Sequence, residues 1–233
     1  MTIFTYTARR SQLQTYFDRT AVDAWARLTG DGPVSRIRET VRAGRDEMRS
    51  TLLDWLPARL DGCRILDAGA GTGVLSAELA RRGADVVAID LSPRLIAIAQ
   101  ERVPSDLGTG QIEFRSGDML DPELGTFDYT VCMDSLIHYE AGDIAGALAR
   151  LASRTRRSVN FTIAPRTAAL TLMHAAGRAF PRSDRAPSIE PVSLAALRRH
   201  LSQDARLSNC EIGRTTKISR GFYISQAVEL VVS

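Results

Sequence analysis

The apolar positions of the first part of the chain repeat at helical spacing. Between residues 11 and 28 they recur at mixed three- and four-residue intervals, which predicts an amphipathic helix that breaks near Thr20. Residues 30–33 predict a turn, and the apolar face of residues 34–56 predicts a second helix that a proline ends. No strand pattern interrupts this part, so we predict a helical cap over residues 1–60.

The next hundred or so positions alternate between short apolar runs and helical patterns. The predicted strands are 63–68, 85–89, 111–115, 127–133 and 158–163. The predicted helices between them are 74–82, 93–102 and 143–153. Such alternation is typical of βαβ units, so we predict a parallel sheet with helices on both faces.

The remainder of the chain has a different pattern. It predicts a helix over 167–180, a loop over 181–191, a short helix over 193–201, and strands over 207–212 and 222–232. Two strands without a helix between them are expected to form an antiparallel hairpin at the sheet edge. We therefore predict a second unit over residues 61–233, in which residues 166–190 form an insertion that covers the site.

Composition narrows the class of protein. The chain has 233 residues, 44% of them hydrophobic, and its net charge is +3. It contains no eighteen-residue apolar run and no apolar leader, so neither a transmembrane helix nor a signal peptide is expected. Three scattered cysteines predict reduced thiols in a cytoplasmic protein. All basic residues except Lys217 are arginine, but they form no dense basic stripe, which argues against nucleic-acid binding.

Glycines dominate the turn after the first predicted strand. Asp67 precedes a Gly-x-Gly-x-Gly run over residues 69–73, which lies between a strand and a helix as nucleotide-binding turns do. Val74 stands where the dinucleotide fingerprint places its third glycine, which disfavours a nicotinamide site. Asp90 ends the next strand, where a carboxylate accepts hydrogen bonds from ribose hydroxyls. The alternative is that Asp90 caps the following helix, although Ser92 is the better cap.

This turn resembles that of the class I S-adenosylmethionine (SAM)-dependent methyltransferases. The resemblance implies a Rossmann-like α/β fold with a mostly parallel sheet, a C-terminal antiparallel hairpin and an N-terminal helical lid. It also implies that Asp67 contacts the methionine end of SAM, Asp90 the ribose, Asp118 the adenine amine and Met119 the adenine ring. The alternative for these aspartates is a role in a turn, for which Asp is commonly used. The positions assigned to SAM, with S-adenosylhomocysteine as the product, are Asp67, Gly69, Ala70, Gly71, Gly73, Asp90, Leu91, Asp118, Met119 and Asp134.

Segments outside the glycine turn carry a narrower resemblance. They are Tyr16-Phe17-Asp18-x-Thr20, Trp25, Asp31-Gly32-x-Val34, Asp134-Ser135-Leu136-Ile137-His138-Tyr139, Phe161–Arg166 and Arg220–Tyr223. Together they are similar to the magnesium-protoporphyrin IX O-methyltransferase family of chlorophyll and bacteriochlorophyll biosynthesis. One departure is Thr29, where the family often has an aromatic residue, so any catalytic role of that aromatic residue does not carry over.

The resemblance implies methyl transfer to one propionate of Mg-protoporphyrin IX, which gives the monomethyl ester. A propionic acid has a pKa near that of Glu, about 4.3, so the nucleophile is ionised at neutral pH and needs no general base. Opposite charges are partly lost in the transition state, so a water-excluded site with fixed alignment favours the reaction. An arginine on the reacting carboxylate would weaken the nucleophile, so arginines are expected on the other propionate.

The catalytic residues assigned in this way are His138, Asp134 and Tyr16. His138 lies near the carboxyl end of the fourth strand, where open α/β sheets bind ligands, and it can align the carboxylate or bind the magnesium. The substrate-binding residues assigned are Tyr16, Phe17, Trp25, His138, Tyr139, Arg166, Arg182 and Arg185. The alternatives are that the aromatic residues anchor the N-terminal helix, that the arginines are solvated charges, and that His138 is a packing residue.

Two other functions stay open. One is a small-molecule O-methyltransferase for a quinone or phenol, with His138 as base, and the other is a non-catalytic porphyrin carrier. Magnesium arrives inside the porphyrin, and no carboxylate cluster predicts a protein metal site. The resemblance implies the porphyrin-binding subunit of magnesium chelatase as a partner. Residues 166–190 combine apolar residues with arginines, which predicts either a peripheral contact with the photosynthetic membrane or a cover for the active site.

Overall fold

A seven-stranded sheet forms the centre of the protein. The computed structural model describes residues 3–18, 22, 29, 35–166 and 189–233. The strands are β1 (Arg64–Ala68), β2 (Asp85–Asp90), β3 (Gln111–Ser116), β4 (Phe127–Cys132), β5 (Thr155–Ile163), β6 (Cys210–Arg220) and β7 (Tyr223–Val232). Their order across the sheet is β3-β2-β1-β4-β5-β7-β6, and the first five run parallel. Both the parallel part and the antiparallel C-terminal pair were predicted from the sequence.

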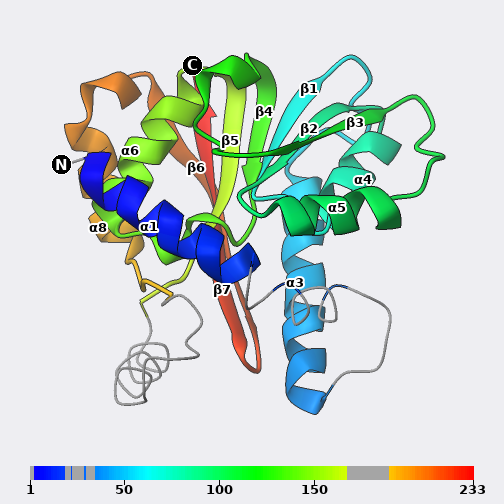
Figure 1. Cartoon of the computed structure of the whole chain (residues 1–233). Coiled ribbons are helices and arrows are strands. Elements are labelled where there is room, and N and C mark those ends of the chain that lie inside the picture. The colour runs from blue at the N-terminus through cyan, green and yellow to red at the C-terminus, as the bar shows by residue number, and fades with distance from the viewer. Residues whose placement is uncertain (1–2, 19–21, 23–28, 30–34, 167–188) are drawn as a thin grey trace.

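Helices cover both faces of the sheet (Figure 1). They are α1 (Ile3–Tyr16), α3 (Arg36–Asp54), α4 (Val74–Arg81), α5 (Pro93–Arg102), α6 (Ala141–Ala152) and α8 (Leu194–Gln203). Single 3₁₀ turns lie at Pro122–Leu124 (η2), Leu136–His138 (η3) and Ala205–Leu207 (η5). Alternate residues of β1 point to opposite faces, so Ile65 packs with α3 and α4, whereas Leu66 packs in the core that contains α6 and α8.

The strand order brings two turns together at the carboxyl edge of the sheet. β1 lies between β2 and β4, so the turns that follow β1 and β4 leave the sheet side by side. The direction of the strand order reverses at this point, and open α/β sheets bind ligands in the crevice that results.

The first helix differs from its predicted bounds. α1 begins at Ile3 and ends at Tyr16, so the start predicted at residue 11 was wrong. The early turns of α1 carry Tyr6, Arg9 and Arg10, which make polar contacts with the domain and therefore leave no apolar repeat to recognise. The Gly30–Pro33 turn and the break near Thr20 lie outside the described residues.

The second predicted helix, α3, packs in the hydrophobic core with the sheet. α3 begins after Ser35, whose side chain accepts the N–H of Arg38 and so caps the helix. Its buried residues Met48, Leu52 and Leu53 pack with residues of β1, α4 and β7. Residues 36–54 therefore share one hydrophobic core with the sheet.

The C-terminal hairpin is longer than predicted. β6 spans Cys210–Arg220, whereas the prediction placed a strand over 207–212, and Leu207 lies in η5. β6 is the edge strand, most of its side chains are exposed, and its Gly-Arg-Thr-Thr-Lys stretch shows no apolar alternation. The expected helix over 167–180 and the loop that follows lie almost entirely outside the described residues. No helix among the described residues is long and apolar enough to cross a membrane.

Candidate active site

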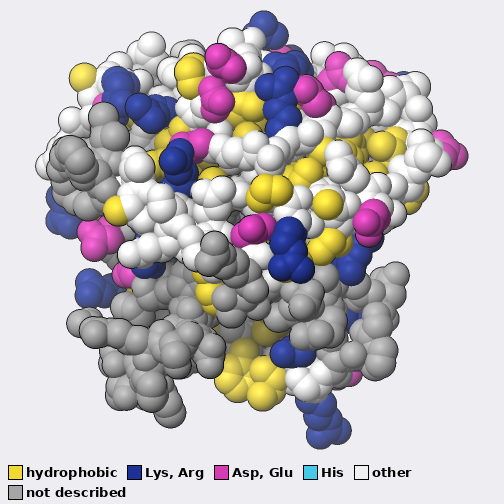
Figure 2. Space-filling view, in the orientation of Figure 1, with side chains coloured by type: hydrophobic (Ala, Val, Ile, Leu, Met, Phe, Trp, Pro, Cys, Tyr) yellow, Lys and Arg dark blue, Asp and Glu magenta, His cyan; other side chains and the backbone are white. Residues whose placement is uncertain are grey.

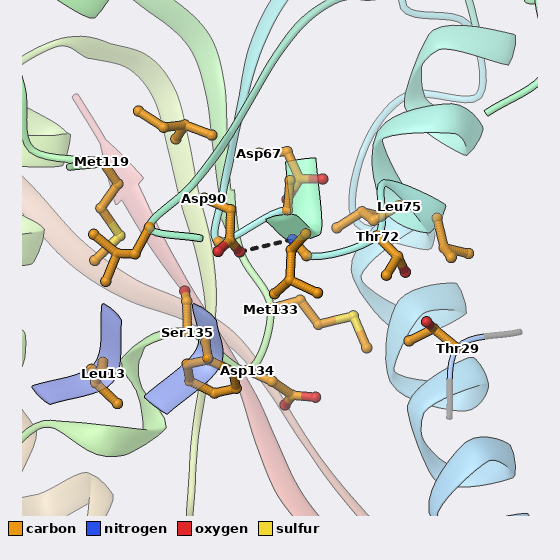
Figure 3. A pocket seen from close by; sticks show the side chains of 18 of the residues that line it. Leu13, Thr29, Asp67, Thr72, Leu75, Asp90, Met119, Met133, Asp134 and Ser135 are labelled. Carbon is orange, nitrogen blue, oxygen red and sulfur yellow. Dashed lines mark hydrogen bonds between the residues drawn. The ribbon is translucent and has the colours of Figure 1, made fainter. Parts of the chain in front are cut away.

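A cavity of about 290 Å³ opens at the carboxyl edge of the sheet. Its lining comes from the turns that follow β1 to β4, from α1, and from the helices α3 and α4 (Figure 3). The residues assigned from the sequence that line it are Phe17, Asp67, Gly69, Ala70, Gly71, Asp90, Leu91, Met119, Asp134, His138 and Tyr139. A concave site with a few polar groups on apolar walls is the usual form of a small-molecule site.

The glycine turn forms the floor of this pocket. The N–H groups of Gly69 and Ala70 both donate to the Ile89 carbonyl, which ties the turn to the end of β2. Gly69 has a φ of 89°, and a Cβ atom there would lie 2.5 Å from the Cβ of Ser135. Only glycine allows the turns after β1 and β4 to approach so closely.

Asp67 lies beneath the turn and is only 1% exposed. Its Oδ2 accepts a hydrogen bond of 2.6 Å from the Ser76 hydroxyl, which comes from the first turn of α4. Burial raises the pKa of Asp67 to about 7, although the bond from Ser76 opposes this rise. The carboxyl is therefore poised to change its charge when a cation or a hydrogen-bond donor binds beside it.

Asp90 connects the ends of β1 and β2. Its two carboxylate oxygens accept the N–H groups of Gly71 and Ser92, each at 2.9 Å, and the first bond is drawn in Figure 3. Burial raises the pKa of Asp90, and the backbone N–H donors oppose the shift. Ser92 caps α5, as the sequence indicated, which leaves Asp90 at the pocket wall.

The turn after β3 places Met119 in the pocket but not Asp118. Asp118 Oδ1 accepts the Tyr6 hydroxyl at 2.9 Å and the N–H of Leu120 at 2.9 Å, and its Oδ2 accepts Arg10 at 2.7 Å. An ionised carboxylate has about four lone-pair positions, so it can accept a further donor. In this structure Asp118 connects the turn to α1.

His138 forms part of the pocket wall that the turn after β4 contributes. It ends η3, the residue is 8% exposed, and its ring meets the Phe17 ring edge-on at 5.8 Å between centroids. The Arg9 side chain donates to the His138 carbonyl at 2.9 Å. Tyr139 is buried and stacks on Tyr6 with ring centroids 5.0 Å apart. α1 therefore lies over the turn after β4 and closes one side of the pocket.

The arginines of α3 were not among the site residues predicted from the sequence. Arg42, Arg45 and Arg49 all line the pocket, because spacings of three and four residues put them on one face of the helix. Arg45 pairs with Asp134 at 2.5 Å, and Arg49 pairs with Asp46 at 2.9 Å and with Glu78 at 2.6 Å. That spacing was the available signal, but α3 was interpreted only through its apolar face.

Other assigned residues lie away from the pocket or outside the description. Gly73 caps α4 and Tyr16 packs edge-on against Phe17, but neither lines the cavity. Arg166 is exposed and also lies outside the lining. Trp25, Arg182 and Arg185 lie outside the described residues. Thr29, the departure from the family pattern, does line the pocket and lies beside α3 (Figure 3).

Charged side chains are mixed on the surface. On the face in Figure 2, arginine and lysine residues lie among acidic and apolar ones and do not gather into one stripe. Within the described part of the chain, no three His, Cys, Asp or Glu residues lie together as a metal site would require.

The strand order, the antiparallel last pair, the glycine turn and the carboxylate at the end of β2 define a class I SAM-dependent methyltransferase. A methyltransferase-domain model matches residues 65–158, and a model described as magnesium-protoporphyrin IX methyltransferase C-terminus matches residues 132–232. A magnesium-protoporphyrin O-methyltransferase of Rhodobacter capsulatus is 50% identical over 96% of this chain and 97% of its own length. The chain belongs to the magnesium-protoporphyrin O-methyltransferase family.

A solved structure and a more distant relative complete the comparison. The crystal structure of magnesium protoporphyrin IX methyltransferase from Synechocystis PCC 6803 with bound SAH superposes with a TM-score of 0.83 at 31% identity. It covers 96% of this chain and 99% of that one. A ubiquinone biosynthesis O-methyltransferase of Xanthomonas oryzae is 42% identical, but over only 37% of each chain.

Proposed function

We propose that this protein transfers the methyl group of SAM to one propionate carboxylate of Mg-protoporphyrin IX and releases the monomethyl ester. The observation that carries the proposal is the composition of one cavity. It combines the glycine turn of the class with the Asp134–Tyr139 segment that resembles this family in particular. The 50% identity to the Rhodobacter capsulatus enzyme extends over both parts.

The residues of the pocket fit SAM. Asp90 offers carboxylate oxygens for ribose hydroxyls, the glycine turn gives close access to the backbone, and Met119 gives an apolar contact for a ring. Ser135 Oγ is buried beside the pocket with no hydrogen-bond partner in the described structure, so it can still bond to a ligand. Bound SAM supplies an electrophilic methyl group on a positively charged sulfur.

The protein's own contribution is alignment and exclusion of water. The substrate carboxylate is ionised at neutral pH, so no side chain has to remove a proton. Asp134 is paired with Arg45 and is therefore engaged rather than available as a base. His138 lies in the wall where a carboxylate can be aligned, and a neutral imidazole weakens the nucleophile less than an arginine would.

A panel of methyl acceptors tests this function. The protein is incubated with labelled SAM and, separately, with Mg-protoporphyrin IX, its dimethyl ester, metal-free protoporphyrin, a quinol and a phenol. Label is expected in Mg-protoporphyrin but not in the dimethyl ester, which has no free propionate. Label in the quinol or phenol with none in the porphyrin would contradict the proposal and favour the small-molecule function. SAM binding without transfer to any acceptor would favour a carrier.

We also propose how the parts of the chain divide the work. Within residues 1–60, α1 acts as the cap on the unit formed by residues 61–233, because it bonds to the turns after β3 and β4 over the pocket, whereas α3 packs in the core of that unit. Residues 166–190 act as the second cover. Of their described residues, Arg166 and Ile189 are exposed, whereas the Glu190 N–H donates to the Ile137 carbonyl at 2.9 Å.

Delivery of the porphyrin belongs to the same proposal. A large apolar macrocycle is poorly soluble, so it is expected to arrive from the porphyrin-binding subunit of magnesium chelatase. The proposed location is cytoplasmic, with peripheral contact to the photosynthetic membrane through residues 166–190. Co-sedimentation with anionic vesicles at low and high salt tests the contact. Association that is absent at low salt, or that survives neutral replacement of the arginines there, would contradict it.

A further inference from the structure

The turn after β4 begins with an unusual backbone conformation. Asp134 has a φ of 55°, and among the described residues it is the only one other than glycine with a positive φ. Asp tolerates this left-handed region better than most residues, but the conformation still needs support from its surroundings. The support has to come from the Asp134 side chain and backbone N–H.

Three elements supply it. The Asp134 N–H donates to the Thr162 hydroxyl at 2.8 Å, from β5. The carboxylate accepts the Tyr223 hydroxyl of β7 at 3.0 Å and Arg45 Nη1 of α3 at 2.5 Å. The Asp134 side chain is only 4% exposed and that of Arg45 is 17% exposed, so the ion pair is largely desolvated. Such charged hydrogen bonds are stronger than neutral ones.

The position of Asp134 determines where the rest of the turn lies. Ser135 follows Asp134 and packs closely against Gly69 of the glycine turn. A Cβ atom added to Gly69 would lie 2.5 Å from the Ser135 Cβ. His138 comes four residues after Asp134, and Met133, Ser135 and His138 all line the pocket. A change in the Asp134 conformation would therefore move the proposed catalytic wall relative to the proposed SAM site.

We propose that Arg45 and Tyr223 are positioning residues that act through Asp134. They hold its carboxylate between α3 and β7, and so set the direction in which Ser135 and His138 face the pocket. The proposal rests on the methyl transfer proposed above. It also gives Asp134, which was assigned as catalytic from the sequence, a positioning role.

The charges of the Arg45–Asp134 ion pair are compatible with a carboxylate substrate. Arg45 lies in the pocket wall, but Asp134 at 2.5 Å neutralises it. The wall beside His138 thus gains hydrogen-bonded rigidity without a net cation, which would weaken an attacking carboxylate. Removing Arg45 would leave the Asp134 charge buried without this cation.

Tyr223 provides a clean test because it does not line the pocket. Its ring packs on α3 so tightly that a Cβ on Gly44 would lie 2.6 Å from its Cδ1. Burial, then Asp134, raises the pKa of Tyr223, so the hydroxyl remains a donor. Tyr223→Phe keeps the ring and removes the hydroxyl, which donates to Asp134 and also bonds to the Ser225 side chain. Tyr129→Phe is the matched control. Tyr129 is also a buried tyrosine of the sheet, but in the described structure it makes no hydrogen bond to Asp134.

The kinetic arm of the test compares kcat with cofactor binding. Loss of one hydrogen bond to a charged group predicts that Tyr223→Phe lowers kcat by about 5- to 30-fold, while the Kd of SAM changes less than about threefold. Arg45→Met is expected to lower kcat further, and Arg45→Met with Asp134→Asn should recover part of the loss because the unpaired charge is gone. Tyr129→Phe is expected to keep the wild-type kcat.

The second arm needs no ligand. The chain has three histidines, so histidine ring signals in the NMR spectrum of ¹³C-labelled protein are few, and His138→Ala identifies one of them. The His138 signal is expected to shift in Tyr223→Phe and in Arg45→Met, while that of His200 in α8 stays in place. Wild-type kcat together with an unmoved His138 signal in both variants would overturn the inference. A large rise in the SAM Kd of Arg45→Met, with Tyr223→Phe unchanged, would also overturn it and make Arg45 a ligand contact. Failure of the wild type to methylate the porphyrin would instead count against the proposed function, and the NMR arm would still decide the inference.

Discussion

Asp90 serves two parts of the pocket, since it holds the Gly71 N–H and faces the proposed ribose position. Asp90→Ala is expected to weaken SAM binding by roughly 1–3 kcal/mol, because the ribose hydroxyls lose the carboxylate that would accept their hydrogen bonds. Isothermal titration with SAM measures the change. Asp85→Asn, at the exposed start of the same strand, is the matched control and should bind as the wild type does. Unchanged affinity in Asp90→Ala would contradict the ribose assignment.

Asp67 makes stability depend on pH. Its folded pKa of about 7 lies above the value near 3.9 of an unfolded Asp, so the folded protein binds this proton more tightly. The contribution of Asp67 to the free energy of unfolding is therefore greatest below about pH 4 and falls as the pH rises to about 7. Relative to wild type, Asp67→Asn is expected to gain stability across this window.

Urea unfolding at several pH values measures this difference. Ser76→Ala removes the bond that lowers the Asp67 pKa, so the upper limit of the window should move to higher pH in that variant. A difference between wild type and Asp67→Asn that is constant from pH 4 to 8 would show that Asp67 does not titrate there.

His138 carries the proposed alignment of the substrate. His138→Ala is expected to lower kcat by about 10- to 100-fold, the usual cost of poor alignment, with the SAM Kd within about threefold of wild type. Steady-state kinetics with Mg-protoporphyrin, together with SAM titration, give both values. His200→Ala, in α8, is the control. Wild-type kcat in His138→Ala would place His138 among the packing residues.

At the scale of the elements, α1 depends on a small set of polar contacts. Tyr6 and Arg10 both donate to Asp118, and Arg9 bonds to the His138 carbonyl. These bonds add to the apolar contacts of Leu13 and Tyr6 and fasten a cover over the pocket, and such polar contacts can break and re-form when ligands enter.

Loss of the contacts to Asp118 should therefore speed the release of SAM. In Tyr6→Phe with Arg10→Ala, two hydrogen bonds to one carboxylate are lost, so the dissociation rate of SAM is expected to rise by about 5- to 50-fold. Stopped-flow displacement measures this rate. Gln14→Ala, on the exposed side of α1, should leave it unchanged. An unaltered rate in the double variant would mean that α1 does not retain the cofactor.

The sequence predicted those elements whose apolar pattern reflects burial. α5 was predicted with its observed bounds, and its Pro93 and Ser92 signals are local. The start of α1 and most of β6 were missed, because one is held by polar contacts and the other is an exposed edge strand. The arginine face of α3 has a local signal in its spacing that was not used. The bonds of Asp134 to α3, β5 and β7 join residues up to 89 positions apart, and no local pattern records such pairs.

At the scale of the whole molecule, the sheet order makes the site. The turns after β1, β2, β3 and β4 meet α3 and α1, while among the described residues the antiparallel pair reaches the same pocket through Tyr223 and Asp134. The class-wide SAM part and the family-specific part therefore share one cavity. A methyl group and a propionate carboxylate bound there would meet within a single enclosed space.

A single-turnover experiment tests whether the protein methylates the porphyrin carboxylate. The protein is mixed with an equal amount of methyl-labelled SAM and an excess of Mg-protoporphyrin IX, and the porphyrins are separated by chromatography. Label is expected to move into a monomethyl ester, up to one equivalent per active protein, and base hydrolysis of the ester is expected to release it. Label that stays in SAM while the protein demonstrably binds both ligands would contradict the proposed methyl transfer.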